Sequence, residues 1–251
     1  MKRMRDILKP QEMLAYREVT DRAPNWQWSG SMWHWGREAA RSMRATHAVF
    51  LQDDLDLHPD FTTVLGAMAH AVHNRAIGLI ANHPYCRRAV ERGDAWYLTS
   101  ECLGSGYVLP LVLLDLFLQW RSTLPEHRLR TTNEDYLLTC WLNMTGRRTW
   151  HPLPSPIDHR TDLASTNPKD GYPFRRSYVR WDANAVISRD LRDKETWTTA
   201  QPPLDFGFDS TGAHPELRLG VDPGRLPTYA DGAILTEHKR IETAESTGAR
   251  Y

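Results

Sequence analysis

An apolar segment that ends in a group of acids is the feature that most constrains this chain. Residues Thr46–Leu51 form an apolar run that predicts a buried strand, and Asp53, Asp54 and Asp56 follow it directly. Ligands of open α/β sheets bind outside the carboxyl ends of the strands, which is where these acids are expected. Hard divalent cations bind through carboxylates together with substrate phosphates, so the acids predict a metal-and-phosphate site. The alternative is that they only cap the next helix.

The composition is that of one medium-sized α/β domain with a tail. The chain has 251 residues, of which 41% are hydrophobic, and this is enough for a sizeable core. Its 31 basic residues are balanced by 31 acidic residues, so the chain has no overall positive field with which to hold nucleic acid or an anionic membrane. Any such binding is expected to be local.

Three further features predict a cytoplasmic protein without a membrane span. The longest apolar stretch, 107–118, is interrupted by Pro110 and Asp115 and is too short to cross a bilayer, and the N-terminus lacks the apolar segment of a signal peptide. The cysteines are odd in number and far apart, as expected for reduced thiols rather than a disulfide framework. They are Cys86, Cys102 and Cys140.

Strand and helix patterns alternate along the chain. Apolar residues at helical spacing predict helices over 32–43, 59–73, 110–120 and 132–143. Apolar runs predict strands over 46–51, 77–81, 96–99, 107–109 and 149–151. Pro24 and Gly30 predict a loop over Asp21–Gly30. Because alternating patterns imply parallel crossover units, we expect an α/β fold with a Rossmann-like mixed, mostly parallel sheet flanked by helices.

The chain changes character after about Asn167. The following residues are polar, with scattered proline, glycine and charge and few apolar residues in any period. We therefore expect one domain over residues 1–167. Residues 168–251 are expected to form an extended, irregular region that is partly disordered or packs on the domain.

The acidic segment also carries a family resemblance. Leu51-Gln52-Asp53-Asp54, followed by His58-Pro59, is similar to the Asp-x-Asp motif of nucleotide-sugar glycosyltransferases of the A-type fold, in particular small family 2-like enzymes of bacteria and their phages. The resemblance implies that Asp54 is the metal-bound aspartate and that Asp53 contributes to donor binding. Gln52 stands where the family has its first acid.

Three further elements extend this resemblance in the family's order. Trp35-Gly36-Arg37, on the helix before the acidic strand, lies where such enzymes often hold the donor. Gly104-Ser105-Gly106 resembles the glycine-rich turn beneath the sugar and the acceptor. Asn133-Glu134-Asp135 opens a helix and resembles the Glu-Asp pair whose aspartate is the general base of inverting members. The resemblance thus implies catalytic roles for Asp135 and its neighbour Glu134.

A histidine completes the implied site. The run 154–159, Pro-Ser-Pro-Ile-Asp-His, resembles the segment with which such enzymes return a histidine to the metal. By this resemblance His159 joins Asp54 as a metal ligand, and a neutral imidazole suits Mn²⁺ better than Mg²⁺. We therefore expect both residues to face a common cleft with Asp53 and Asp135.

Each element also has a structural interpretation. Trp33 and Trp35 are either core or subunit-contact aromatics or stack on a base or sugar. The turn glycines supply backbone freedom with or without a ligand. Glu134 and Asp135 would stabilise a helix N-terminus without any catalysis, and His159 fits a solvent-facing loop nearly as well as a metal site.

The function implied is the metal-dependent transfer of a sugar from a nucleoside-diphosphate sugar to an acceptor hydroxyl, with inversion. The acceptor remains open among a protein, a glycan, a lipid-linked sugar and modified phage DNA. Two alternatives use the same residues: a metal-dependent nucleotidyltransferase or phosphoesterase, and a binding module that kept the fold without activity.

One departure from the family concerns the N-terminal half. Only about fifty residues precede the acidic motif, and they contain no apolar run that predicts the family's first strand. Either this half is shortened or translation starts upstream of Met1, so the sequence does not identify the donor.

Overall fold

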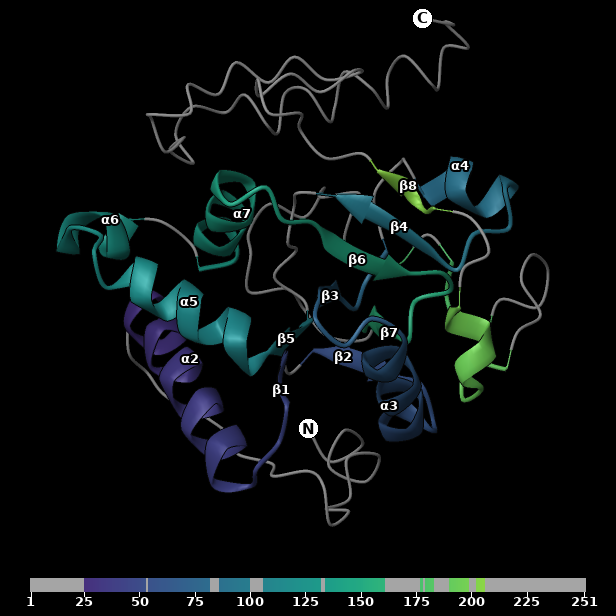
Figure 1. Ribbon diagram of the computed structural model, residues 1–251, viewed down its shortest axis with the longest axis horizontal. Helices are drawn as coiled ribbons and strands as arrows, with labels where there is room; N and C mark the ends of the chain where they lie inside the picture. The colour runs from purple at the N-terminus through teal and green to yellow at the C-terminus, as the bar shows by residue number, and fades with distance from the viewer. Residues whose placement is uncertain are drawn as a thin grey trace, which may run out of the picture.

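A six-stranded mixed sheet forms the centre of the fold, with helices on both of its faces (Figure 1). The computed structural model describes residues 25–52, 54–81, 86–99, 106–131, 134–160, 177, 179–182, 190–198 and 202–205. The large sheet has the strand order β1 (His47–Leu51), β5 (Gly106–Pro110), β3 (Ala76–Gly78), β6 (Thr149–Pro152), β4 (Trp96–Thr99) and β8 (Leu204–Asp205). A small sheet pairs β2 (Leu55–Leu57) with β7 (Ile157–His159). The helices are α2 (Asn25–Ser42), α3 (Phe61–Ala71), α4 (Cys86–Glu91), α5 (Leu111–Arg121), α6 (Glu126–Thr131), α7 (Glu134–Met144) and the 3₁₀ helix η2 (Lys194–Trp197).

The α/β class and the flanking helices are confirmed, but the expectation of a mostly parallel sheet is wrong. Only β3–β6 and β4–β8 pair in parallel, whereas β1–β5, β3–β5 and β4–β6 are antiparallel. Alternation of strands with helices does not determine strand direction. Residues 79–95 between β3 and β4 are enough for a crossover to a parallel strand, yet the two strands run in opposite directions.

The two faces of the large sheet bury different side chains. In β1, Phe50 points to the face covered by α2, α5 and α7, whereas Val49 packs against the core on the face of α3 and η2. The paired strand β5 alternates in the same way, with Tyr107 on the first face and Val108 on the second. This alternation follows from the two-residue period of a strand and produces two separate cores.

The predicted helices and strands are present in the structure, with shifted ends. The exception is the segment before Met32, where a helix replaces the predicted loop. The structure continues α2 back to Asn25, so the loop predicted over Asp21–Gly30 is wrong from Asn25 onward. A glycine inside a helix costs about 1 kcal/mol relative to alanine, and Gly30 therefore weakens a helix without ending it. Packing against neighbouring elements supplies most of the stability of a helix in a protein, and α2 packs on β1, α5 and α7.

Part of the chain beyond Asn167 belongs to the same packed unit. Trp197 of η2 is buried in the core beside α3 and Trp96, and β8 adds to the large sheet next to β4. These described residues pack on the domain. The proposed boundary at residue 167 and the disorder of the region stay predictions.

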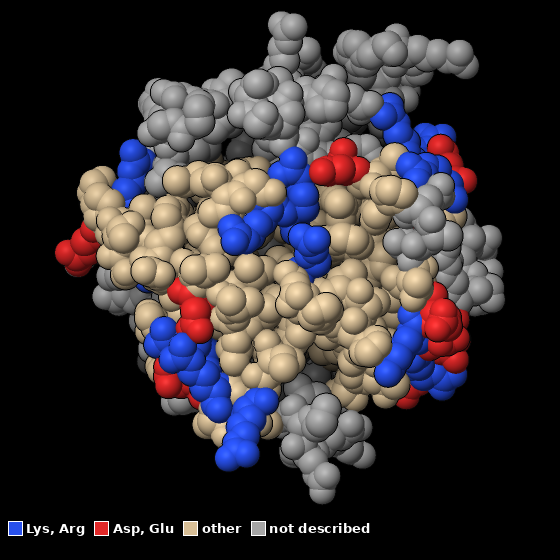
Figure 2. Space-filling view, in the orientation of Figure 1, with Lys and Arg blue, Asp and Glu red and all other residues tan. Residues whose placement is uncertain are grey.

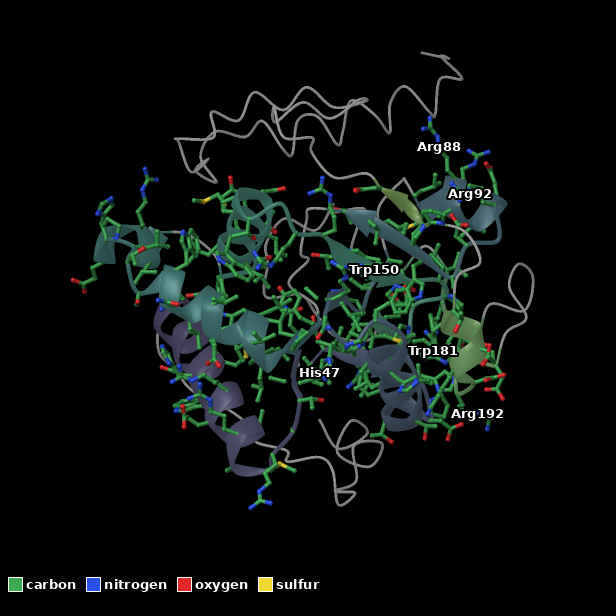
Figure 3. The ribbon with its side chains drawn as sticks, viewed as in Figure 1. His47, Arg88, Arg92, Trp150, Trp181 and Arg192 are labelled. Atoms are coloured by element: carbon green, nitrogen blue, oxygen red, sulfur yellow. The ribbon has the colours of Figure 1, made fainter. Side chains whose placement is uncertain are left out.

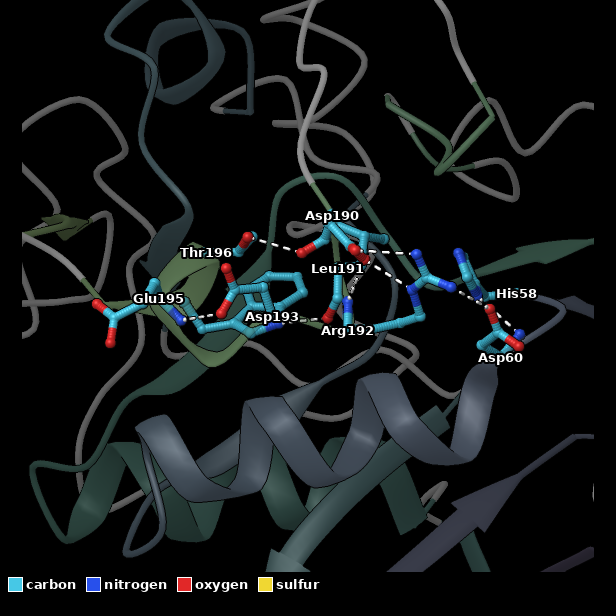
Figure 4. A network of polar contacts seen from close by, with 9 residues as sticks. His58, Asp60, Asp190, Leu191, Arg192, Asp193, Glu195 and Thr196 are labelled. Atoms are coloured by element: carbon cyan, nitrogen blue, oxygen red, sulfur yellow. Dashed lines mark hydrogen bonds and ion pairs between the residues drawn. The ribbon is translucent and has the colours of Figure 1, made fainter.

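Ion pairs fix the described residues near 190 to the beginning of α3. Arg192 binds Asp190 through two of its nitrogens and lies 3.5 Å from Asp60, which precedes α3 (Figure 4). This contact holds the pKa of Asp190 low, at about 2, mainly through the hydrogen bonds from Arg192. Trp181 contacts the ring of His58, which lies just before Asp60 in the chain, and Arg192 lies near Asp60. Trp181 and Arg192 are therefore on the same side of the molecule (Figure 3).

The described surface has charges of both signs. On the face shown in Figure 2, basic and acidic side chains form small neighbouring groups separated by uncharged surface, as expected for a chain with equal numbers of each. None of the helices in the described residues has an apolar stretch long enough for a membrane span.

Candidate functional site

The ends of five strands lie along one side of the large sheet. β1, β3 and β6 run in one direction and β5 and β4 in the other, so the carboxyl ends of the first three meet the amino ends of the other two. The register places Leu51 opposite Gly106 and Pro152 opposite Trp96. We call this the carboxyl edge. Asp54 follows β1 at this edge, and the segment that reaches His159 follows β6.

The small sheet brings Asp54 and His159 together. Leu55 pairs with His159 in the antiparallel ladder, and the backbone N–H of Arg160 donates to the carbonyl of Asp54 at 2.9 Å. The His159 Nδ1 atom then lies 3.4 Å from the Asp54 Oδ2 atom; the His159 side chain is largely buried and that of Asp54 is partly exposed. Two residues that are far apart in the sequence are thus neighbours at the carboxyl edge, as the resemblance implies.

This pair has the chemistry of a divalent-cation site. It offers one carboxylate oxygen and one imidazole nitrogen, and such donors suit Mn²⁺. Two adjacent ligands about 2.1 Å from one octahedral ion lie about 3.0 Å apart, close to the distance between Nδ1 and Oδ2. Within the described ranges, no group of three or more His, Cys, Asp and Glu side chains is arranged around a common point for a metal. The pair would therefore leave most coordination positions to substrate oxygens or water.

Gly106 lets the small sheet pack closely on the large one. A Cβ atom added at this residue would lie 3.0 Å from Ile157 of β7, 3.2 Å from Leu51 and 3.3 Å from Leu79. The predicted ligand-cradling glycine therefore has a packing role at the junction of the two sheets. The other two residues of that turn, Gly104 and Ser105, lie outside the described residues, as does Asp53.

Asp56, the third acid of the segment, lies in the small sheet beside another acid. It lies directly opposite Asp158 in the small sheet, and Arg180 Nη1 lies 3.7 Å from Asp56 Oδ2 and 3.9 Å from Asp158 Oδ2. Because like charges directly opposite each other are destabilising, the guanidinium offsets the repulsion of the two carboxylates.

Glu134 is a buried structural ion. Its carboxylate accepts hydrogen bonds from Arg121 Nε and Nη2, at the end of α5, and from Trp33 Nε1 at 3.1 Å. The side chains of Arg121 and Glu134 are 11% and 5% exposed. Glu134 therefore fixes three helices against one another, and its oxygens are already engaged by donors within the protein.

Asp135 has a raised pKa. Burial raises its pKa to about 6, opposed by hydrogen bonds from the backbone N–H groups of Tyr136 and Asp135, and the charge of Glu134 raises it further. A base whose pKa lies near the working pH is suited to proton transfer. The residue is partly exposed, unlike Glu134.

Topology places Asp135 at the carboxyl edge. The C-terminus of α7 leads through residues 145–148 to the start of β6 at the opposite edge, so the N-terminus of α7 points back to the carboxyl edge. The helix lies over the face of α2 and α5, whereas the small sheet packs on the side of α3. α7 and the small sheet therefore pack on opposite faces of the large sheet, and a common cleft for Asp135 with Asp54 and His159 stays a prediction.

The residues proposed to hold the donor have structural contacts on α2. A Cβ atom at Gly36 would lie 2.5 Å from the ring of Phe50, so this glycine permits close packing of α2 on β1. Arg37 pairs with Glu38 at 2.9 Å and lies 3.8 Å from Asp115 of α5. Trp35 is partly exposed, and its role in donor binding stays a prediction, as do those of the other two.

Trp33, in contrast, is a core residue. It is fully buried among the rings of Phe50, Tyr107 and Phe117. Of the two interpretations of this tryptophan, the core one is confirmed.

Sequence reasoning missed Arg121, Asp158 and Arg180. Arg121 ends an apolar helix and looks like a simple C-terminal helix charge. Asp158 was visible beside His159 in the sequence, but nothing in the sequence indicated that it would face Asp56. A signal for Arg180 existed in its neighbour Trp181, since a tryptophan in an otherwise polar region suggests packing.

The sequence matches no known family model, and no curated protein is significantly similar to it. The resemblance to glycosyltransferases therefore depends on the motifs and on the geometry of the site.

Proposed function

We propose that this protein is a metal-dependent glycosyltransferase that moves a sugar from a nucleoside-diphosphate sugar to an acceptor hydroxyl with inversion. The observation that carries the proposal is the approach of His159 to Asp54 at the carboxyl edge, with 3.4 Å between Nδ1 and Oδ2. We further propose that the fold is of the glycosyltransferase A-type.

Asp54 and His159 would hold the divalent ion through one oxygen and one nitrogen. When bound, Mn²⁺ or Mg²⁺ offsets the charge that develops on the leaving nucleoside diphosphate. Metal binding by Asp54 and His159 requires the neutral form of His159, because only an unprotonated nitrogen can act as a ligand.

Asp135 would accept the proton of the acceptor hydroxyl as that oxygen attacks the anomeric carbon. Its pKa of about 6 leaves it ionised at neutral pH while keeping it a stronger base than an ordinary aspartate. The buried Arg121–Glu134–Trp33 contacts fix the first turn of α7 and hence the direction of the Asp135 side chain. A single base with a metal-assisted leaving group predicts inversion at the anomeric carbon.

The alternative of two-metal phosphoryl transfer receives less support. Such sites hold two ions about 3.5–4 Å apart and need further carboxylates beside the first ligand. Two other acids of the small sheet, Asp56 and Asp158, already lie beside the Arg180 guanidinium. This arrangement favours a single ion bound by Asp54 and His159.

The test is a thermal-shift panel of the full chain with UDP, GDP, CDP and ADP, each with and without Mn²⁺. We expect one diphosphate to raise Tm in the presence of Mn²⁺ and to do little without it. The corresponding nucleotide sugars are then incubated with the protein, and the products are separated by ion-exchange chromatography. Release of nucleoside diphosphate supports glycosyl transfer, and release of pyrophosphate identifies a nucleotidyltransferase. The absence of any Mn²⁺-dependent shift across the panel would contradict the proposal.

A further inference from the structure

Asp158 is buried on the face of the small sheet where exposure would be expected. Successive residues of a strand point to opposite faces, and Leu55, Leu57 and Ile157 point into the core beside α3. Asp158 lies one residue out of phase with them, so it points away from that core, yet it is only 1% exposed. Another part of the chain must therefore cover it.

The covering segment is the stretch that contains Ser177 and residues 179–182. The Ser177 N–H donates to Asp158 Oδ1 at 2.8 Å, and the His159 N–H donates to the same oxygen at 3.0 Å. The Ser155 N–H donates to the carbonyl of Val179 at 2.9 Å, which attaches the segment to the chain just before β7. One carboxylate thus joins the backbone of His159 to a segment that is distant in sequence.

Arg180 extends this connection to β2. Its Nη1 atom lies within 4 Å of both Asp56 and Asp158, and its Nε atom lies 2.8 Å from Asp182 Oδ1. The guanidinium also lies over the ring of Trp181, 4.3 Å from the centroid, which restrains its position. The two strands of the small sheet are therefore bridged on one face by a single fixed cation.

The small sheet needs such support. Its strands have three residues each, and an isolated two-stranded ladder is marginal in water. Asp54 lies just outside the ladder and is joined to it by the bond between its carbonyl and the Arg160 N–H. A shift of β7 against β2 would separate the Asp54 carboxylate from the His159 ring.

We infer that Asp158 is a positioning residue for the metal site, which sets the distance between Asp54 and His159 by clamping the backbone of His159 to the Arg180 segment. The inference depends on the proposed function, because it takes Asp54 and His159 as metal ligands. Asp158 itself does not touch the ion in this account. Residues that orient metal ligands typically contribute a factor of 10 to 100 in metal affinity.

The test measures Mn²⁺ binding to the full chain by the loss of the electron paramagnetic resonance signal of free Mn²⁺. Asp158→Asn keeps the size of the side chain and one acceptor oxygen but removes the charge that faces Arg180. We expect its Kd for Mn²⁺ to rise about 10- to 100-fold, with circular dichroism in EDTA showing a folded protein. Asp182→Asn is the matched control, since this acid also pairs with Arg180 but its side chain is 56% exposed. The Kd of this variant for Mn²⁺ should stay within about twofold of the wild-type value.

Arg180→Gln provides a second route, because Asp158→Asn removes a buried charge and can fail to fold. We expect Arg180→Gln to weaken Mn²⁺ binding in the same range and Arg180→Lys to restore most of it, which a loss of packing alone would not do. Unchanged Kd values in folded Asp158→Asn and Arg180→Gln would overturn the inference and leave the proposed metal site standing. An equal loss of Mn²⁺ affinity in Asp182→Asn would also overturn the inference. A wild-type chain that binds no Mn²⁺ would overturn both this inference and the metal-dependent function.

Discussion

Trp33 donates its indole N–H to the Glu134 carboxylate across a sequence separation of 101 residues, with 3.1 Å between Nε1 and Oε2. Arg121 binds the same carboxylate from α5, so one buried acid joins α2, α5 and α7. An acid that is surrounded by donors in this way holds helices together. Its neighbour Asp135 has a raised pKa and is the residue proposed to accept the proton.

Replacing Glu134 should therefore affect stability first. Glu134→Gln leaves Arg121 with a buried, uncompensated charge, and breaking a buried pair of this kind costs about 3–5 kcal/mol. Urea unfolding followed by circular dichroism measures this loss. Trp33→Phe serves as a comparison, because it removes one hydrogen bond but leaves the ion pair, and it should cost about 1–2 kcal/mol. A Glu134→Gln protein of normal stability and reduced turnover would instead give Glu134 a direct catalytic role.

Replacing Asp135 should affect turnover first. Asp135→Asn keeps the shape of the side chain but removes its basic oxygen, so we expect turnover to fall by about 10²- to 10⁴-fold while nucleoside diphosphate binding persists. In the wild type, kcat/KM should rise with pH through about 6, as Asp135 becomes ionised. Steady-state rates between pH 5 and 8 check both points. Near-normal turnover of Asp135→Asn, or loss of binding in step with rate, would show that the base lies elsewhere.

Asp135 should also make stability depend on pH. Its pKa is raised in the folded protein from 3.8 to about 6, so the folded state binds the proton more tightly than the unfolded chain. This contribution to stability is fully present below about pH 3.8 and is lost as the pH rises through about 6. Asp135→Asn removes the cost of ionisation and should be more stable than the wild type at pH 7.5, by up to about 3 kcal/mol. Urea unfolding at pH 5 and pH 7.5 measures the difference, and an advantage that is no larger at the higher pH would contradict the expectation.

Asp54→Ala should abolish the effect of Mn²⁺ without unfolding the protein. Asp54 is partly exposed and lies outside the core, so its loss should change the stability of the ligand-free protein little. In the wild type, Mn²⁺ and a diphosphate at about 100 times Kd would raise Tm by about 5–10 °C, and the variant should lose most of this shift. Asp60→Asn is the control, because this exposed acid pairs with Arg192 instead. An unchanged shift in Asp54→Ala would refute its assignment as a ligand.

Two glycines should respond to alanine in opposite directions. Gly36→Ala places a methyl group 2.5 Å from the buried ring of Phe50, and such overpacking costs about 1–3 kcal/mol. Gly66 lies inside α3, where a Cβ atom would meet nothing within 4 Å, so Gly66→Ala should stabilise the protein by about 0.5–1 kcal/mol. Chemical denaturation of both variants tests the packing of α2 on β1. Tolerance of Gly36→Ala would mean that α2 can move away from the strand.

The sequence predicts most of the strands and helices because local patterns encode them. Residues 96–99 were predicted as a strand and form β4, and the helix predicted over 110–120 is α5 to within one residue. Strand direction was predicted poorly, since it depends on how each connection returns to the sheet. The three-residue strands β2 and β7 were not predicted either, because they are stabilised by contacts that no local pattern reveals.

The candidate site was predictable only in part, for the same reason. Motifs identified Asp54 and His159, and the structure brings them together. The sequence does not separate the roles of Glu134 and Asp135, because both are acids in the first turn of one helix. Only their three-dimensional partners, Arg121 and Trp33 for Glu134, distinguish the helix anchor from the proposed base.

The pairing of β2 with β7 also determines when the site can form during synthesis. β2 leaves the ribosome early, whereas β7 and then Arg180 follow only after most of the large sheet has been made. Pairing of strands that are distant in sequence is slow, because the intervening chain must first be ordered. The Asp54–His159 pair is therefore expected to be completed late in folding, and truncated nascent chains that end before β7 would contain the acidic segment without its partner.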